Sequence, residues 1–559
     1  MNGRPVPGNR TLLVVNAEVR GRPGQRVRVG PEEILEVGAG LAPRRGEPVL
    51  DAAGGAVIPG LHDHHVHIRG LVAARLSADL SAAADPAAFD RLLSAAAAAV
   101  PSGQWLRATG WSEASAGPLD RHRLDALTGS VPARVQHRSG AMWVLNSAAL
   151  REVGADHSDA DGIERDDLGA PTGRLLRLDG WLRDRLPAGR GLPADWLRAG
   201  LADHGRRCAR LGLTGFTDAT PDRGQPDVDS FWILSVERTF PQRLLLMAPP
   251  GLRSPPSGRV TLGPRKLILD DAALPEVAEL AALVGQTHRR GSALAVHCVT
   301  AEQLIVAVAA FEQAGTAGDR IEHASVVPPA YAARLARLHL TVVTQPGFIS
   351  ARGDDYLREV PAPEQPWLYP CATLARAGTA VAAGTDAPFG PSDPWRCVAA
   401  AITRRAPSGR VVGRAERLSP ARALRLFLTA PEDPGRLREV RPGQPGDLCV
   451  LRTPLRAFLS RPAADGVRAG IVAAQVFEAD PPGCVVRPGS GHAGLASSPL
   501  GRQLSELGVV VAGRDTKILI DHIRTIDVSN VAGELADYLS RDDMAEVEHT
   551  LSRYFGLLR

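Results

Sequence analysis

The feature that most constrains the fold is a series of short apolar runs that alternate with helical stretches rich in alanine, leucine and arginine. This alternation, between residues 58 and 440, is typical of βα units with a parallel sheet, so the predicted class is α/β. The predicted strands cover 57–59, 213–217, 243–247, 266–269, 293–296, 320–322, 340–344 and 380–385. Most of them lead into a polar or ionisable residue. Because the C-terminal strand ends form the catalytic face of a (β/α)8 TIM barrel, we expect that fold and a site at those ends.

Two histidines follow the first predicted strand at a spacing of two. Alternate side chains on a strand share a face, so His65 and His67 can reach one metal ion. His62 and His64 show the same spacing, and spacing alone leaves the register open. Further candidate metal-binding residues stand at or near later strand ends: Lys266, His297, His323 and Asp386.

The regions that flank the predicted barrel have a different pattern. Residues 1–57 and 441–480 contain short strands punctuated by Gly and Pro, which predicts one composite β-sandwich built from both flanks. The first two barrel strands are too far apart for one unit, so we expect an insertion at about 105–200, either a lid over the site or a surface embellishment. Residues 481–502 have the composition of a linker, and 503–559 form a small C-terminal extension.

Composition excludes several classes of protein. The 65 basic and 61 acidic side chains nearly balance, and no dense basic stripe is interleaved with aromatics, so a nucleic-acid partner is not expected. No apolar stretch approaches the roughly 18 residues of a membrane helix, and no signal peptide is found, so we expect a cytoplasmic protein without a membrane partner. The six cysteines form no C-x-x-C pair and are predicted to be reduced thiols. A homo-oligomer stays possible.

Lysine is almost absent from this chain. Only Lys266 and Lys517 stand among the 65 basic residues, and the others are arginine. Such a bias replaces lysine by arginine wherever either serves. A lysine that persists is expected to need an amine that can lose its proton, which a guanidinium cannot do. This makes Lys266, the first residue of a predicted strand, an informative candidate.

The motifs around these candidates resemble those of the amidohydrolase superfamily. The stretch PGLHDHHVH, residues 59–67, is similar to its opening pattern PGxxDxHxH, which selects His65 and His67 over the earlier pair. The remaining similarities are Lys266 in KLILD, His297 in VHC, His323 in RIEH and Asp386 in GTDAP, which look like the residues of the fourth, fifth, sixth and eighth strands. Order and spacing resemble the amidohydrolase-3 branch, the YtcJ-like proteins, over roughly residues 10–480.

This resemblance implies a metal centre and a reaction. The implied ligands of one or two divalent ions, with zinc as the expected metal, are His65, His67, Lys266, His297, His323 and Asp386. Lys266 would be carboxylated by CO2, and Asp386 would be the general base that passes a proton from water to the leaving nitrogen. The implied reaction is hydrolysis of a non-peptide C–N bond in a small amide, N-acyl, formamide or cyclic amide substrate.

The chain departs from that branch at two places, which leaves the substrate open. Residues 139–141 are Ser-Gly-Ala where many members have Gly-His, and residues 299–301 are Val-Thr-Ala where many have Gly-Asp. Weaker candidates complete the set. Asp218 is predicted to orient a histidine or to cap a turn, His64 and Cys298 to be structural, and Gln345 and Trp111 to line a pocket.

The C-terminal segment 503–559 resembles the C-terminal half of MazF/PemK-type toxins. The half that carries the catalytic residues of those toxins is not found, so we expect an inert tail. Two alternatives to the amide hydrolase remain. A deaminase of the same superfamily is one, although such relatives generally lack the lysine of the fourth strand. A non-catalytic interaction protein that works through the tail is the other.

Overall fold

The computed structural model describes residues 11–187, 194–256 and 258–479. The predicted linker at 481–502 and the toxin-like segment at 503–559 lie outside the described residues. The chain divides into two compact units. The described part of the first unit comprises residues 11–76, 194–256 and 258–479, and that of the second comprises residues 77–187.

Parallel strands form the centre of the first unit and confirm the α/β class. They form two sheets, ordered β15-β14-β13-β6 and β16-β17-β18-β19-β20. The first sheet contains β6 (Leu61–Val66), β13 (Leu213–Asp218), β14 (Arg243–Met247) and β15 (Val260–Gly263). The second contains β16 (Arg265–Ile268), β17 (Leu294–Cys298), β18 (Arg320–His323), β19 (Thr341–Thr344) and β20 (Ala380–Ala383). Seven of the eight strands predicted from apolar runs lie in these sheets. The run at 57–59 was wrongly predicted as the first of them, because it pairs antiparallel with residues 448–450 in a flanking sheet, and β15 was not predicted.

Two seams connect these sheets. At the first seam β15 and β16 follow one another directly, separated only by Pro264, which has no N–H to donate to a ladder. At the second seam the Asp386 N–H, just after β20, donates to the His65 carbonyl of β6 at 2.7 Å. Gly384 permits this approach, because a Cβ at that position would lie 2.5 Å from the backbone nitrogen of His65.

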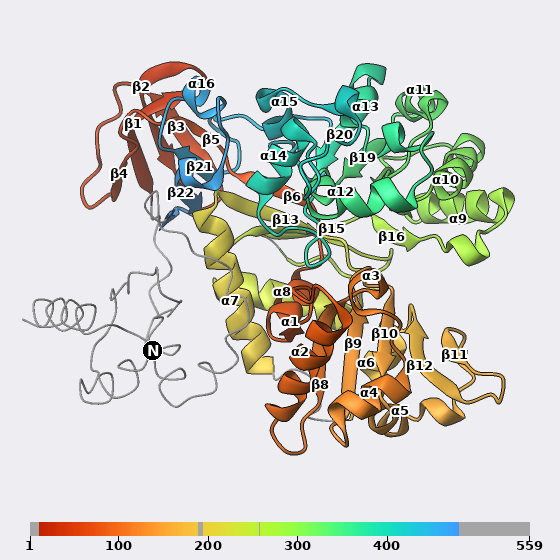
Figure 1. Ribbon diagram of the computed structural model, residues 1–559. Helices are drawn as coiled ribbons and strands as arrows, with labels where there is room; N and C mark the ends of the chain where they lie inside the picture. Colours follow the sequence, from red (N-terminus) through yellow and green to blue (C-terminus); the bar gives the residue numbers. More distant parts are fainter. Residues whose placement is uncertain (1–10, 188–193, 257, 480–559) are drawn as a thin grey trace, which may run out of the picture. The chain divides into compact units, whose positions relative to one another are not determined.

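Helices separate the parallel strands along the chain and pack on them. They are α1 (Ile68–Arg75), α7 (Ala194–Arg210), α8 (Gln225–Val236), α9 (Val277–Arg289), α10 (Ala301–Ala314), α11 (Pro329–Arg337), α12 (Gly347–Glu359), α13 (Cys371–Ala377), α14 (Pro394–Thr403) and α15 (Pro420–Arg425). Thr300 and Gln303 form a capping box at the start of α10. Leu280 of α9 and Leu304 of α10 share one buried core with Val296 of β17, and Figure 1 shows both helices beside the second sheet.

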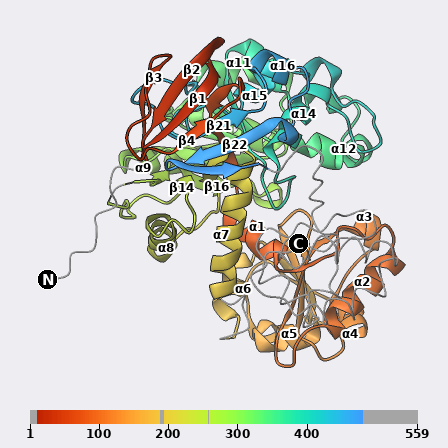
Figure 2. The ribbon, with the colours of Figure 1, turned by 90° about the vertical axis from the view of Figure 1, so that its left-hand side faces the viewer.

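Two antiparallel-rich sheets come from the flanks of this region. The first has the order β3-β2-β1-β4, with β1 (Leu12–Val19), β2 (Arg22–Val29), β3 (Ile34–Gly38) and β4 (Val49–Asp51). The second has the order β23-β22-β21-β5, with β5 (Val57–Pro59), β21 (Leu448–Leu451), β22 (Val467–Val472) and β23 (Gln475–Glu478); the short α16 (Leu455–Phe458) follows β21. Val14 and Val27 share a core with Leu448 and Ile471, so both flanks build one hydrophobic interior. Figure 2 shows strands of the two sheets, β1 and β2 and β21 and β22, next to one another.

Asp447, just before β21, ties the flanking sheets to the parallel strands. Its carboxylate pairs with Arg259, which precedes β15, and with Arg243 of β14, whose Nε lies at 2.5 Å. The side chains of Asp447 and Arg259 are only 1% and 7% exposed. A change that removes one partner therefore leaves a buried, uncompensated charge.

We expect Asp447→Asn to lower the free energy of unfolding by about 3–5 kcal/mol, the range for breaking a buried ion pair from one side. Urea denaturation measures this change. The matched control is Asp433→Asn, because the Asp433 side chain is 60% exposed and a surface change stays within about 0.5 kcal/mol. Equal stability of the two variants would contradict the role given to Asp447.

The second unit has its own sheet, ordered β11-β12-β10-β9-β8-β7. Its strands are β7 (Ala78–Asp79), β8 (Leu106–Trp111), β9 (Ala133–His137), β10 (Met142–Leu145), β11 (Ile163–Arg165) and β12 (Pro171–Leu176). Its helices are α2 (Pro86–Ala98), α3 (Glu113–Ala116), α4 (Arg121–Thr128), α5 (Ser147–Glu152) and α6 (Asp179–Arg185). The unit begins at Ser77, earlier than the expected insertion start near 105. The physical reason is that Phe89 and Leu93 of α2 share a core with Trp111, which is itself fully buried there.

Two further sequence expectations concern cysteines and membranes. The five cysteines in the described ranges are all buried free thiols. Cys298 lies in the core beside α9 and α10, and burial raises the pKa of its thiol, which fits a structural residue. No helix of the described ranges has both the length and the apolar character that a membrane crossing requires.

Candidate metal centre

The predicted site residues come from separate strands of the first unit. His65 lies on β6 and His67 follows that strand directly, as the residue before α1. The others lie on β16, β17, the end of β18 and the segment after β20: Lys266, His297, His323 and Asp386. Parallel strands place their carboxyl ends at one edge, which is why residues far apart in the chain can meet there.

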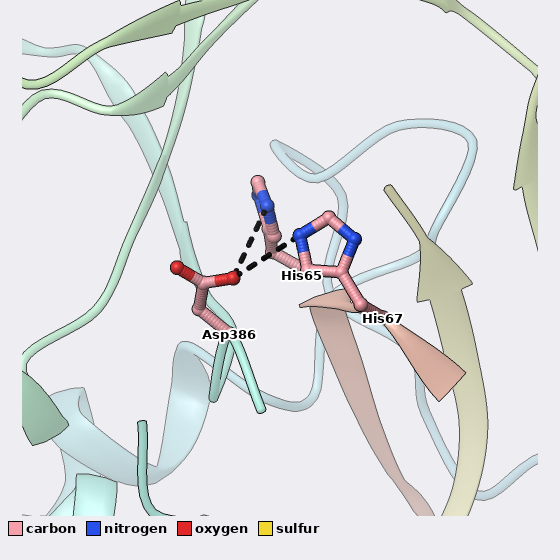
Figure 3. Close-up of side chains that lie close together, drawn as sticks. All are labelled: His65, His67 and Asp386. Carbon is pink, nitrogen blue, oxygen red and sulfur yellow. Dashed lines mark ion pairs between the residues drawn. The ribbon is translucent and has the colours of Figure 1, made fainter. Parts of the chain in front are cut away.

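The Asp386 carboxylate lies at the centre of this group. Its Oδ1 is 3.4 Å from Nε2 of His67 and 3.7 Å from Nε2 of His65, and Figure 3 shows both rings turned toward this oxygen. Its Oδ2 is 3.8 Å from Nδ1 of His323. One carboxylate therefore faces three imidazoles from two different strands.

The remaining two candidates lie against the same rings. Nζ of Lys266 is 3.4 Å from Nε2 of His65. The ring centroid of His297 is 4.4 Å from that of His323, and His323 is in turn 4.6 Å from His65. The structure thus brings all six predicted residues into one cluster.

The donors in this cluster fit a divalent cation. Ligand atoms of His65, His67 and Asp386 lie within 4.8 Å of one another. Oδ1 of Asp386 is buried, and it accepts no hydrogen bond from any residue that the structure describes. A buried acceptor without a donor costs about 1–3 kcal/mol, which a cation would offset. Imidazole nitrogen together with carboxylate oxygen is a donor set that suits zinc.

The electrostatics favour neutral bases. Burial holds the pKa of His65 well below its usual value, and the nearby Lys266 and His67 add to this effect. Burial does the same for His323, with further contributions from His297 and His65. A neutral imidazole keeps a lone pair for a cation. Burial also lowers the pKa of Lys266 to about 8, so its amine can lose its proton near neutral pH.

Two site residues adopt an unusual backbone conformation. His323 has φ of 69° and Asp386 has φ of 52°, in the left-handed region, which costs an ordinary residue roughly 1–3 kcal/mol. Neighbouring hydrogen bonds hold the turn at Asp386. The amide of Thr385 donates to Oδ1 of Asp63 at 2.9 Å, and that same oxygen accepts from the amide of His65 at 3.2 Å. Asp63 therefore joins the β20 turn to β6.

The structure also distinguishes the two histidine pairs, His62/His64 and His65/His67, between which their spacing in the sequence could not decide. Nε2 of His62 lies 2.9 Å from Oγ1 of Thr217, and Nε2 of His64 lies 2.9 Å from Oγ1 of Thr429. Both rings are buried against these threonines, and only the later pair faces Asp386. This agrees with a structural role for His64.

Asp218, at the end of β13, stabilises a turn. One oxygen accepts from the amide of Ile68 at 3.0 Å, at the start of α1, and the other accepts from the amide of Thr220 at 3.1 Å. The carboxylate also pairs with Arg223. Of the two predicted roles, these contacts support capping, and they hold the start of α1 directly after His67.

Three polar residues lie next to the cluster, and the sequence predicted either no role or a different role for each of them. Glu322 contacts Nδ1 of His65 and also pairs with Arg320. Oε1 of Gln345, predicted to line a pocket, lies 2.8 Å from Nδ1 of His323 and is fully buried. The sequence does contain a signal for Glu322 and Arg320. Arginine and glutamate two apart on a buried parallel strand share one face, and buried charges need partners.

Residues 48–477 match the model of a family described as the amidohydrolase family. A Bacillus subtilis protein named as the amidohydrolase YtcJ is 25% identical over 398 residues, which covers 63% of this chain and 74% of that protein. The N-substituted formamide deformylase of Arthrobacter pascens is 25% identical over 484 residues, which covers 76% of this chain and 89% of that enzyme.

Two other matches concern the fold and the tail. The crystal structure of a metal-dependent hydrolase from Pyrococcus horikoshii, 20% identical, has a TM-score of 0.61 and covers 78% of this chain and 95% of its own. A Mycobacterium tuberculosis protein named as a toxin is 53% identical over 47 residues, which covers 8% of this chain and 44% of that protein. The toxin-like resemblance rests on this short match alone.

Proposed function

This chain belongs to the amidohydrolase family and is a hydrolase of carbon–nitrogen bonds other than peptide bonds; from that premise we propose that it cleaves a small amide, N-acyl, formamide or cyclic amide with a water molecule activated at the metal centre. One observation carries the proposal: three imidazoles converge on the Asp386 carboxylate, one oxygen of which has no hydrogen-bond donor among the described residues.

We further propose that the two parallel sheets form one (β/α)8 barrel. Three observations support closure. Strands β15 and β16 continue one another across Pro264. The amide of Asp386 donates to His65 at the other seam. Glu322 of β18 contacts His65 of β6, although these strands belong to different sheets. Such a contact is expected when side chains meet in a barrel interior.

The residues that would hold one or two divalent ions are the six of the cluster: His65, His67, Lys266, His297, His323 and Asp386. A bound ion, for which zinc is our proposal, would supply Lewis-acid activation of the water and of the substrate carbonyl. Asp386 provides the proton transfer, because its Oδ1 faces the place where the imidazoles converge. It takes the proton of the attacking water and delivers it to the leaving nitrogen.

Lys266 supplies an amine that can be converted into an anion. Burial lowers its pKa to about 8, so a fraction of the side chain is neutral at physiological pH. The neutral Nζ can add to the carbon of CO2, forming an N–C bond and releasing one proton to solvent. The resulting carbamate carries a negative charge, whereas the ammonium would repel a cation beside His65.

The proposed function is tested by a substrate panel with purified protein. Stoichiometric zinc, manganese or iron and the release of amine from at least one N-acyl, formamide or cyclic amide compound are expected. His65→Ala and His67→Ala should lose both metal and activity, because each removes an imidazole that faces Asp386. His122→Ala is the control, since His122 is exposed in the second unit. A wild-type protein without bound metal would refute the proposal.

Removal of a residue that only hydrogen-bonds to a metal ligand weakens metal binding by about 10–100-fold. Because Lys266→Met removes a proposed ligand itself, we expect its metal affinity to fall by more than that. In the wild type, ¹³C-labelled bicarbonate should produce a carbamate carbon signal, absent from the variant. The signal should grow as pH rises through about 8, because the folded amine reacts only after it loses its proton. Arg265→Ala is the control on the same strand. Full metal content in Lys266→Met would contradict this role.

A further inference from the structure

Arg320 and Glu322 form a buried charged pair that reaches from β18 to β6. Their side chains are 4% and 0% exposed, and Nε of the arginine donates to Oε1 of the glutamate. The other glutamate oxygen, Oε2, contacts Nδ1 of His65, whose side chain is also fully buried. A second arginine nitrogen donates to the carbonyl of His64 at 2.7 Å. Both members of the pair therefore contact the strand that carries the histidine motif.

This arrangement selects one tautomer of the His65 ring. An ionised carboxylate only accepts hydrogen bonds, so the hydrogen of a neutral ring belongs on Nδ1, where it donates to Glu322. Nε2 then keeps its lone pair, and it is this atom that lies 3.7 Å from Oδ1 of Asp386 and 3.4 Å from Nζ of Lys266. The opposite tautomer would set a lone pair against the carboxylate.

Arg320 compensates the free-energy cost of burying the Glu322 carboxylate. An unpaired carboxylate in a protein interior is strongly disfavoured, and a guanidinium with several fixed donors compensates its charge. Arg320 binds Glu322 on one side and the β6 backbone on the other, so the carboxylate is held against His65 from a fixed direction. The position of Glu322 therefore depends on Arg320.

We propose that Arg320 and Glu322 are positioning residues that hold His65 in the Nδ1–H tautomer and aim its Nε2 lone pair at the metal centre. The effect on metal affinity rests on the proposed function, whereas the tautomer can be measured without any metal. The competing explanation is an ion pair that only stabilises the fold. It predicts no change in the His65 tautomer when the pair is removed.

The first experiment reads the tautomer in metal-free, full-length protein with ¹⁵N-labelled histidine. The resonances of His65 are identified by their loss in His65→Gln. Nitrogen chemical shifts should report Nδ1–H in the wild type and a shift toward Nε2–H in Glu322→Gln. The matched control is Glu416→Gln, because Glu416 is also buried and accepts two hydrogen bonds from Thr373, away from the cluster. Its His65 resonances should stay unchanged.

A second variant keeps the test valid if Glu322→Gln does not fold. The double variant Arg320→Met/Glu322→Gln removes both charges together, so no uncompensated charge is buried. Its His65 should show the same shift toward Nε2–H. Wild-type His65 in the Nε2–H form, or an unchanged Nδ1–H form in both the single and the double variant, would overturn the proposal.

The second experiment measures zinc affinity by competition with a chelator. Glu322→Gln and the double variant should bind zinc about 10–100-fold more weakly than the wild type, while Glu416→Gln should bind it equally well. Equal zinc affinity in all four proteins would overturn the proposed link to the metal centre. If the wild type holds no zinc, manganese or iron, the proposed function fails, and the tautomer measurement still decides whether the pair positions His65.

Discussion

Replacing Asp386 by asparagine should abolish most activity. Loss of a general acid–base group lowers kcat by about 10²–10⁴-fold, and we expect a fall of at least that size. Asparagine keeps the size of the side chain but cannot accept the proton of the water. It also removes the negative charge that faces the imidazoles of His65, His67 and His323. Both the rate and the metal content are therefore expected to fall.

The measurement is kcat and KM on a substrate found by the panel, together with metal content of the same preparation. Asp271→Asn is the matched control, because Asp271 also follows a parallel strand but is exposed and accepts a hydrogen bond from Thr300. That variant should keep wild-type kcat. If Asp386→Asn turned over at the wild-type rate with metal bound, Asp386 would not be the general base.

Metal removal should have an effect of similar size. In the proposed mechanism a bound ion supplies the activation of the water and of the substrate carbonyl, and the neutral imidazoles of His65 and His323 and the Asp386 oxygen that has no donor among the described residues would hold it. Dialysis against a chelator is expected to reduce activity to the rate of the uncatalysed reaction. Re-addition of zinc, manganese or iron should restore it, and the most effective ion identifies the metal.

The same titration has a readout that does not depend on activity. An ion that binds only the folded state stabilises it by RT ln(1 + [L]/Kd), about 2.7 kcal/mol when its free concentration is 100 times Kd. Added metal should therefore raise the melting temperature of the metal-free wild type. The double variant His65→Ala/His67→Ala should show no such rise. Full activity after verified metal removal would contradict a metal-dependent mechanism.

Much of the fold was predictable because its signals are local. Apolar runs such as the one at 213–217 and the one at 293–296 produced strands where they were expected. The scarcity of lysine drew attention to Lys266, which lies 3.4 Å from His65. These signals depend on residue type and on short spacings, which the order of residues contains directly.

Other features were not predictable for a definite reason. The second unit begins at Ser77 because the alanine-rich helix α2 packs in the core of that unit, but its sequence pattern suits a helix of the barrel equally well. The strand near Lys266 is interrupted at Pro264, and its first half pairs with a different sheet. Which sheet a strand joins depends on distant partners, not on its own residues.

The sequence by itself determined the alternation of strands and helices, and it determined which side chains share a face. Spacing and position at strand ends made two histidine pairs and Asp386 candidates, and the resemblance to the amidohydrolase opening pattern selected His65 and His67. Only the tertiary structure decided which nitrogen of His65 points toward the Asp386 carboxylate. Glu322, which sets that orientation, is 257 residues away in the chain, and such a contact exists only once the two sheets have come together.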